Sequence, residues 1–144
     1  MSFKYMPAAG LNNVGSYMVS GRPYLTGSDT QVKSEQVKVE FPNVTQKIKI
    51  DLKSCDSGDV IRVHFTPQSG AGSNSGATIS NLHYWTLTEG ESLELNVKCK
   101  EVYISTPSTN HATTASKWQL CAELTNIPAT SMYDFTEGDA GITE

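Results

Sequence analysis

Three histidines are the first candidates for metal chemistry, because imidazole is a common ligand of transition metals. His64 and His83 fall inside stretches that predict strands, and His111 lies in the polar loop TPSTNHATTAS. No His-x-His or His-Glu-x-x-His spacing brings two of these rings to one ion. We therefore predict no metal site at the histidines and a hydrogen-bonded core role for His83.

Three aspartates around one turn form a second candidate site, since carboxylate oxygens are the ligands that calcium prefers. Asp51, Asp56 and Asp59 lie within nine residues of one another. The twelve-residue pattern of a calcium loop is absent, and Asp, Ser and Gly in this stretch are also the ordinary residues of a turn. The prediction is that these are solvated turn carboxylates and that the chain holds no metal.

Nucleophile and phosphate-binding motifs are missing from the chain. No serine stands in Gly-x-Ser-x-Gly, and no cysteine stands in a recognisable nucleophile motif. The glycine-rich stretch GAGSNSG lacks the Lys-Ser/Thr ending of a phosphate loop, and no helix is predicted to follow it. We predict that the protein is not an enzyme and binds no cofactor.

The cysteines and the charge indicate where the protein works. Cys55, Cys99 and Cys121 are an odd number at wide spacing without Cys-x-x-Cys, which predicts free thiols in a reducing cytoplasm. No signal peptide and no run of 18 apolar residues is recognisable. A net charge of −4 supplies no basic patch for phosphate groups, so we predict neither a nucleic-acid partner nor a membrane partner.

The elements that carry these residues are predicted to be strands. Apolar residues alternate with polar ones in short runs, the pattern of strands with one buried face, and no run of eleven residues has the helical period. We expect residues 37–41 and 48–52 to be adjacent antiparallel strands. The fold class predicted is all-β, an antiparallel two-sheet sandwich of jelly-roll-like topology with seven to eight strands. The runs are 37–41, 48–52, 61–65, 79–87, 92–98, 101–106 and 117–125.

Two tryptophans decide between a buried and a ligand-binding role for the aromatic residues. Trp118 is in phase with Leu120 and Leu124, and Trp85 is in phase with Leu87, so both are predicted to face the core. Replacing Trp118 by alanine should then cost about 3–5 kcal/mol. Exposed tryptophans would instead favour a small carbohydrate-binding module. The long connections 66–78 and 106–116 are either solvated loops or tips that touch a partner.

The two ends of the chain do not follow the strand pattern. The predicted division is an N-terminal docking arm of residues 1–30, a β-sandwich of residues 31–126 and a C-terminal extended segment of residues 127–144. The stretch GLNNVGSYMVSGRPYLTGS, residues 10–28, contains one charged side chain, and Pro is excluded from central strands. Aromatic, sparsely charged arms are explained by docking, either on the chain's own sandwich or on a neighbouring subunit by strand addition. Deleting residues 1–28 is expected to leave a folded sandwich.

Six residues of the arm are predicted to bind the partner. The tyrosines offer large contact area at low entropic cost, and an uncharged segment avoids the desolvation of a docked charge. Proline pre-sets one backbone dihedral, and the lone arginine either pairs with a carboxylate or stays solvated. The predicted partner-binding residues are Tyr17, Val19, Arg22, Pro23, Tyr24 and Leu25.

The arm AAGLNNVGSYMVSGRPYLTGS resembles the opening of small virion structural proteins of tailed bacteriophages. In those proteins an arm of the form Gly-Ser-Tyr-x-Val-Ser-Gly-x-Pro-Tyr precedes a β-rich domain. The resemblance implies a non-enzymatic head decoration or cement protein, attached to the virion through residues 15–24 and assembled in the host cytoplasm. Its implied partners are capsid or other virion proteins and sister subunits of a homo-oligomer. The alternatives are a tail- or fibre-associated receptor-binding module and a carbohydrate-binding sandwich.

Overall fold

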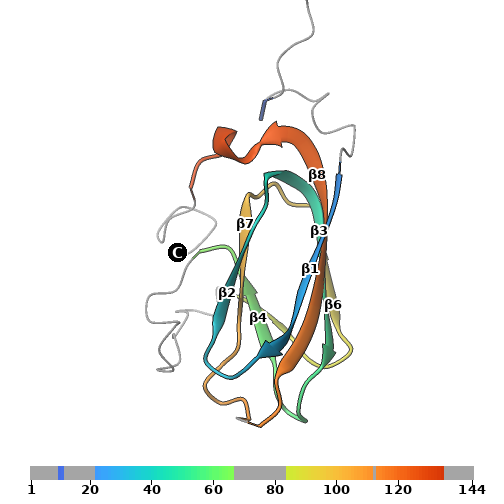
Figure 1. The fold of residues 1–144 in the computed structure, drawn as a ribbon, viewed down its shortest axis with the longest axis vertical. Helices are drawn as coiled ribbons and strands as arrows, with labels where there is room; N and C mark the ends of the chain where they lie inside the picture. Colours follow the sequence, from blue (N-terminus) through green and yellow to red (C-terminus); the bar gives the residue numbers. More distant parts are fainter. Residues whose placement is uncertain (1–9, 12–21, 67–83, 112, 135–144) are drawn as a thin grey trace, which may run out of the picture.

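A computed structural model of the chain describes residues 10–11, 22–66, 84–111 and 113–134. These residues contain eight strands in two four-stranded antiparallel sheets, which pack face to face as a sandwich (Figure 1). The first sheet has the order β1 (Arg22–Gln31), β8 (Ser116–Pro128), β3 (Asn43–Ser54) and β6 (Ser92–Leu95). The second has the order β2 (Gln36–Glu40), β7 (Glu101–Ser105), β4 (Ile61–His64) and β5 (Trp85–Leu87).

The strand pairing is that of a jelly roll. β1 pairs with β8, β2 with β7, β3 with β6 and β4 with β5, all antiparallel, so the chain is paired like one long hairpin. The contacts of β3 with β8 and of β4 with β7 roll this hairpin into two sheets. This arrangement confirms the predicted all-β, antiparallel, jelly-roll-like sandwich.

The core forms where the inward faces of the two sheets meet. On β8 the buried residues Trp118, Leu120, Ala122 and Leu124 alternate with exposed ones, which confirms the inward orientation predicted for Trp118. β3 contributes Ile48, Ile50 and Leu52 by the same alternation, and the second sheet contributes Ile61, Val63, Val102 and Ile104. Burying a side chain of this size stabilises the fold by about 1.5–3 kcal/mol, which makes these residues the main source of stability.

The predicted pairing of the stretches 37–41 and 48–52 is wrong. β2 pairs with β7 and β3 pairs with β8 and β6, so the two stretches belong to opposite sheets. The chain passes between the sheets at Phe41 and Pro42, while Phe41 N–H and Thr45 N–H donate to the carbonyls of Lys100 and Cys99. A period of two shows which face of a strand is buried but does not name its partner, and so the sequence pattern did not exclude this arrangement.

The predicted core position of Trp85 is also wrong, because its side chain is 61% exposed. The register sets Trp85 opposite Val63 and Leu87 opposite Ile61, so Trp85 and Leu87 do share one face of the sheet. Trp85 is, however, the first residue of a three-residue edge strand, and only Leu87 lies deep enough to be covered. His83 lies outside the described residues.

The predicted boundaries of the sandwich are too narrow at both ends. Residues 22–30, assigned by prediction to the arm, form most of β1 and pair with β8 from Arg22 onward. Proline fits here because β1 is an edge strand, where one side of the backbone needs no partner. At the other end β8 continues to Pro128, and a short 3-10 helix, η2 (Ala129–Ser131), follows it.

A second, smaller hydrophobic cluster lies beside the end of β8. It consists of Val44, Ile127 and Met132, with Leu11 packed against it. Leu11 therefore attaches part of the N-terminal segment to the chain's own sandwich. In the described part of the chain, no helix is long and apolar enough to cross a membrane.

Candidate functional site

The residues predicted to bind a partner lie at the start of β1, as far as the structure describes them. Arg22, Pro23, Tyr24 and Leu25 are its first four residues, whereas Tyr17 and Val19 lie outside the described residues. Because successive side chains of a strand point to opposite faces, these four residues cannot all meet the same surface.

Tyr24 faces the interior of the sandwich. Its ring lies edge-on to the Phe41 ring, with centroids 5.3 Å apart and planes at 83°. It is half-buried and packs against the main core. An edge-to-face pair of this kind adds about 0.5–1.5 kcal/mol beyond the area buried, so Tyr24 stabilises the fold of its own chain.

Leu25 points the other way and is 77% exposed. The register places it opposite Cys121 on β8, which is itself opposite Lys49 on β3, so the three form a row on the outward face of the first sheet. A groove of about 450 Å³ runs beside this row. It is lined by Leu25, Thr26, Gly27, Lys49, Asp51, Gln119, Leu120 and Cys121.

The free edge of β1 is regular over its first half only. The pairing with β8 keeps one register from Arg22 to Ser28 and shifts before Gln31. At Gly27 a Cβ atom would lie 2.6 Å from the carbonyl oxygen of Trp118, so the close approach of the two strands requires glycine there. Among the described residues, no strand pairs with the other side of β1. Residues 22–28 therefore offer a short, regular edge to which an extended segment can add.

Of the three aspartates predicted to cluster at one turn, the structure keeps Asp56 and Asp59 together and separates Asp51 from them. Asp51 lies on β3, where the Lys53 ammonium is 3.1 Å and the Lys49 ammonium 3.9 Å from its carboxylate oxygens. Exposed pairs of this kind contribute little to stability. Asp59 is buried, with its side chain 2% exposed, and its partner is His111.

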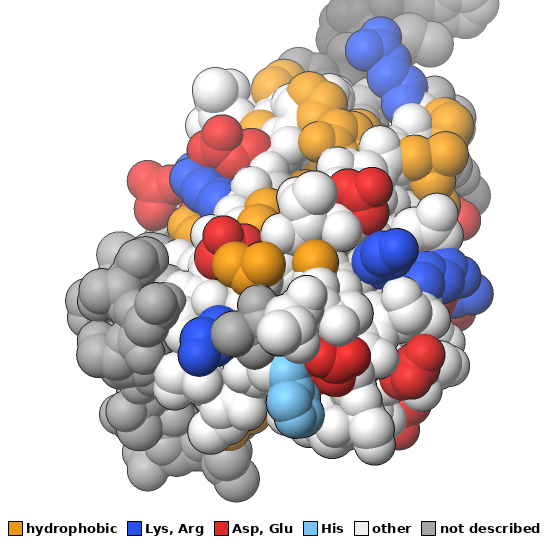
Figure 2. Space-filling model, turned by 60° about the horizontal axis from the view of Figure 1, so that its bottom comes forward, with side chains coloured by type: hydrophobic (Ala, Val, Ile, Leu, Met, Phe, Trp, Pro, Cys, Tyr) orange, Lys and Arg blue, Asp and Glu red, His pale blue; other side chains and the backbone are white. Residues whose placement is uncertain are grey.

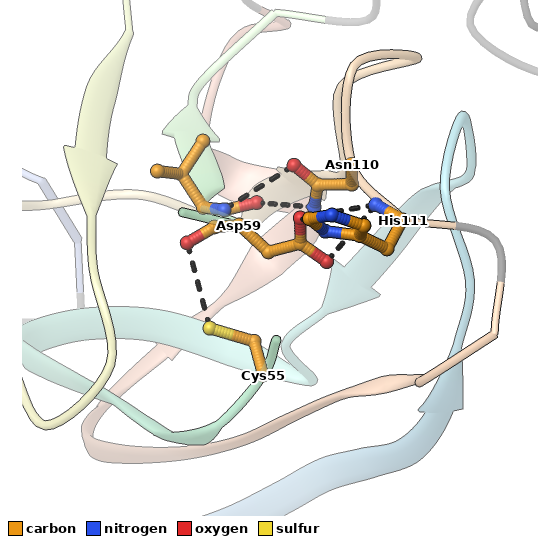
Figure 3. Close-up of polar contacts among 5 residues, drawn as sticks. Cys55, Asp59, Asn110 and His111 are labelled. Carbon is orange, nitrogen blue, oxygen red and sulfur yellow. Dashed lines mark hydrogen bonds and ion pairs between the residues drawn. The ribbon is translucent and has the colours of Figure 1, made fainter. Parts of the chain in front are cut away.

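The Asp59 carboxylate anchors the loop that precedes β8 (Figure 3). His111 Nδ1 lies 2.8 Å from Asp59 Oδ1, and the His111 backbone N–H donates to both carboxylate oxygens at 3.0 and 3.1 Å. Asn110 adds two further bonds, because its side chain donates to the Val60 carbonyl at 2.8 Å and accepts from the Val60 N–H at 3.2 Å. The Cys55 thiol donates to the Asp59 carbonyl at 3.4 Å. These bonds fix the loop at Asn110 and His111 to the turn after β3.

The same cluster is the group of described residues best placed to hold a cation. Ligand atoms of Asp56, Asp59 and His111 lie within 4.8 Å of one another. Both oxygens of Asp59 already accept hydrogen bonds from His111, and so the contacts are explained without an ion. The contact between Asp59 and His111 joins residues 52 positions apart. The only signal for it in the sequence is the high proportion of polar side chains in the two segments. The absence of a metal stays a prediction.

His64 is buried at the end of β4 with both ring nitrogens hydrogen-bonded. Nδ1–H donates to the Thr66 carbonyl at 2.7 Å, which leaves Nε2 to accept from the Ser105 hydroxyl at 2.5 Å. The ring stacks on Tyr103, with centroids 5.6 Å apart. Burial lowers the pKa of His64, so the neutral ring is the form that the fold favours. A serine bonded to a histidine can be a nucleophile and base pair, but with the ring 1% exposed we assign it to bracing the strand ends.

A cluster of three charged groups lies on the outward face of the second sheet. The Lys38 ammonium is 2.9 Å from Glu101 and 2.7 Å from Glu40, and the Tyr103 hydroxyl donates to Glu101 at 3.0 Å. Burial, with the hydrogen bond to Glu101, raises the pKa of Tyr103 to about 12. On the face shown in Figure 2, acidic and basic side chains are interspersed and neither sign forms a continuous patch.

Comparisons of the chain with protein-family models, with curated proteins and with solved structures found no match.

Proposed function

We propose that this protein is a non-enzymatic structural protein of a tailed-bacteriophage virion, which decorates the head and attaches through its N-terminal arm and the edge of β1. The observation that supports this most directly is Leu25, an apolar side chain 77% exposed on an edge strand that continues from the arm. The jelly roll is compatible with the proposal, since capsid proteins and lectins both use it, but a fold alone does not assign a function.

The mechanism of attachment is addition of a strand to β1. An extended segment of a capsid protein or of a sister subunit pairs with residues 22–28, where the register is regular. Leu25 then fills an apolar site on the partner, and the groove beside it accepts a side chain in return. Each attached copy contributes a modest binding free energy, and the symmetry of the particle repeats that contribution at every equivalent site.

The uncharged arm extends this interface. Residues 10–28 carry one charged side chain, Arg22, so docking them requires little desolvation of charge. Arg22 lies opposite Leu124 at the start of β1, where it can pair with a carboxylate of the partner. Tyr17 and Val19 contact the same partner in this proposal, while Tyr24 serves the fold of its own chain.

The test compares an arm deletion with a point substitution on β1. The deletion ends at residue 21. Deletion of residues 1–28 was expected from the sequence to abolish attachment and leave the sandwich folded, but it would remove most of β1. Leu25→Thr removes the exposed apolar side chain and should change the free energy of unfolding by less than about 0.5 kcal/mol. Val32→Thr is the matched control, because Val32 is also an exposed apolar residue but follows β1.

The measurement is the occupancy of the tagged variants on phage particles that lack the wild-type protein, with circular dichroism as the check on folding. Deletion of residues 1–21 and Leu25→Thr should each lower occupancy, and Val32→Thr should not. Full occupancy of both folded variants would refute attachment through this edge. Labelling at the tail instead of the head would favour the tail- or fibre-associated alternative.

A further inference from the structure

The backbone of β1 turns its hydrogen-bonding groups alternately toward β8 and toward its free side, and the register of the sheet shows which residues do which. In an antiparallel pair, residues that exchange hydrogen bonds alternate with residues whose N–H and C=O point away from the partner. Leu52 bonds toward the β6 side, because its N–H donates to the Glu91 carbonyl and its carbonyl accepts from the Gly90 N–H, both at 3.0 Å. The backbone groups of Trp118, opposite Leu52 on β8, therefore point toward β1.

The same alternation identifies the groups on the free edge of β1. Ser28 lies opposite Trp118 and so bonds to β8, as do the residues two and four positions before it. Leu25 and Gly27 therefore turn both N–H and C=O to the free side, and Pro23 turns its carbonyl there. Proline fits at position 23 because it has no N–H and none is needed for the bonds to β8. The free edge offers donors at Leu25 and Gly27 and acceptors at all three residues.

β1 is the least protected of the sheet edges in the described part of the chain. Natural proteins protect such edges with charged side chains or by keeping the edge strand short. The other edge strands are β6, β2 and β5. β5 and β6 have three and four residues, and β2 carries the ion pair of Lys38 with Glu40. β1 has ten residues and no charged side chain from Pro23 to Ser28, so it is the edge best suited to pair with another chain.

We propose that β1 pairs antiparallel with β1 of a second copy of this chain, about a twofold axis at Leu25. The first sheets of the two copies then join into one continuous sheet. This proposal rests on the strand addition proposed above and names its partner. In this register the two Leu25 residues exchange both hydrogen bonds, and the Gly27 N–H of each copy donates to the Pro23 carbonyl of the other. Both donors on the free edge of each copy thereby gain an acceptor.

The side chains and charges of β1 also fit a second copy. Leu25 of the second copy covers the exposed Leu25 and lies beside Gly27, where the close approach to β8 excludes any side chain. The groove of about 450 Å³ lined by both residues accepts it. The antiparallel arrangement brings Arg22 at one end of β1 near Asp29 at the other end of the second copy, and it keeps the two arginines on opposite sides of the axis. A strand of the same sequence therefore supplies an apolar side chain, hydrogen-bonding groups and opposite charge where this edge needs them.

The test measures the mass of the purified full-length protein by sedimentation equilibrium, without phage particles. The edge is shorter than a standard interface, so the dimer should be weak. The average mass should rise from the 15.6 kDa of one chain toward twice that value as the concentration approaches the millimolar range. Leu25→Lys and Leu25→Glu should each stay monomeric, because like charges would lie directly opposite each other at the axis. An equimolar mixture of these two variants should dimerise, because the charges at the axis are then opposite.

Two further sets of variants serve as controls. Val32→Lys and Val32→Glu are matched to the charged variants, because Val32 is also exposed but follows β1, and each should dimerise as the wild type does. Leu25→Pro removes an N–H on the free side and keeps the bonds to β8, so circular dichroism should show a folded protein and sedimentation a monomer.

A wild type that stays monomeric at every concentration would overturn the proposal, and so would a mixture of the two charged Leu25 variants that does not dimerise. The result is separable from the test of attachment to the particle. If the wild type is monomeric but Leu25→Thr lowers occupancy on particles, β1 pairs with another virion protein and only the dimer is wrong. If the wild type dimerises but Leu25→Thr keeps full occupancy, the dimer is right and attachment through β1 is wrong.

Discussion

Replacing Gln31 by methionine would break a buried chain of hydrogen bonds that joins the two sheets. Trp118 Nε1–H donates to Gln31 Oε1 at 2.5 Å, and Gln31 Nε2–H donates to the carbonyl of Ile104 at 2.9 Å. Trp118 lies on β8 of the first sheet and Ile104 on β7 of the second. Trp118 is 2% exposed and Gln31 is 1% exposed, so water cannot replace the lost partner.

The magnitude follows from the groups left without partners. Gln31→Met keeps a side chain of similar length but leaves the indole N–H of Trp118 unpaired, which costs about 1–3 kcal/mol. Trp118→Phe removes that donor, leaves Gln31 Oε1 unpaired at a similar cost, and adds the loss of ring volume. The double variant has neither unpaired group. We therefore expect it to be more stable than the sum of the two single effects by about 1–2 kcal/mol.

The wild type, Gln31→Met, Trp118→Phe and the double variant form a double-mutant cycle. The assay is urea unfolding of these four proteins, followed by far-ultraviolet circular dichroism. The free energies of unfolding come from linear extrapolation, with a check that the m-value is unchanged. Gln119→Met is the matched control, because Gln119 is exposed on the same strand as Trp118 and should change the free energy of unfolding by less than about 0.5 kcal/mol. Single effects that add to within about 0.3–0.5 kcal/mol would refute the coupling of Gln31 to Trp118.

Two further predictions concern titratable groups. Burial lowers the pKa of His64 in the folded protein. At pH values between the folded and unfolded pKa values, the unfolded chain therefore binds more protons than the folded one. The contribution of neutral His64 to the free energy of unfolding is present above about pH 6.5 and should be lost as the pH falls. Free energies of unfolding from pH 8 to 5.5 should fall less steeply for His64→Gln than for the wild type; equal slopes would contradict the assignment. Burial raises the pKa of Cys99 to about 11, so iodoacetamide at pH 8 should modify exposed Cys121 first and Cys99 only on unfolding, as peptide mass mapping would show. Equal rates at Cys99 and Cys121 would contradict the described burial.

The alternation of apolar and polar residues was enough to predict the class of the fold. It predicted strands, identified the inward face of β3 and β8, and placed Trp118, Leu120 and Leu124 in the core. This succeeds because the direction in which a side chain leaves a strand depends only on its position along that strand. The sequence did not show which of the predicted partner-binding residues face outward. Tyr24 packs against Phe41 inside the sandwich, whereas Leu25 faces outward.

By itself, then, the sequence determined that this protein is an antiparallel β-sandwich with Trp118 inside it. Only the tertiary structure decided that β2 and β3 lie in opposite sheets and that Pro23 belongs to an edge strand. It alone also showed that Trp85 lies at the rim of the core and that Asp59 forms a hydrogen bond with His111. The physical reason is that the period of a strand is a local property. Strand partners, sheet edges and contacts across 52 residues depend on which distant segments bury each other best.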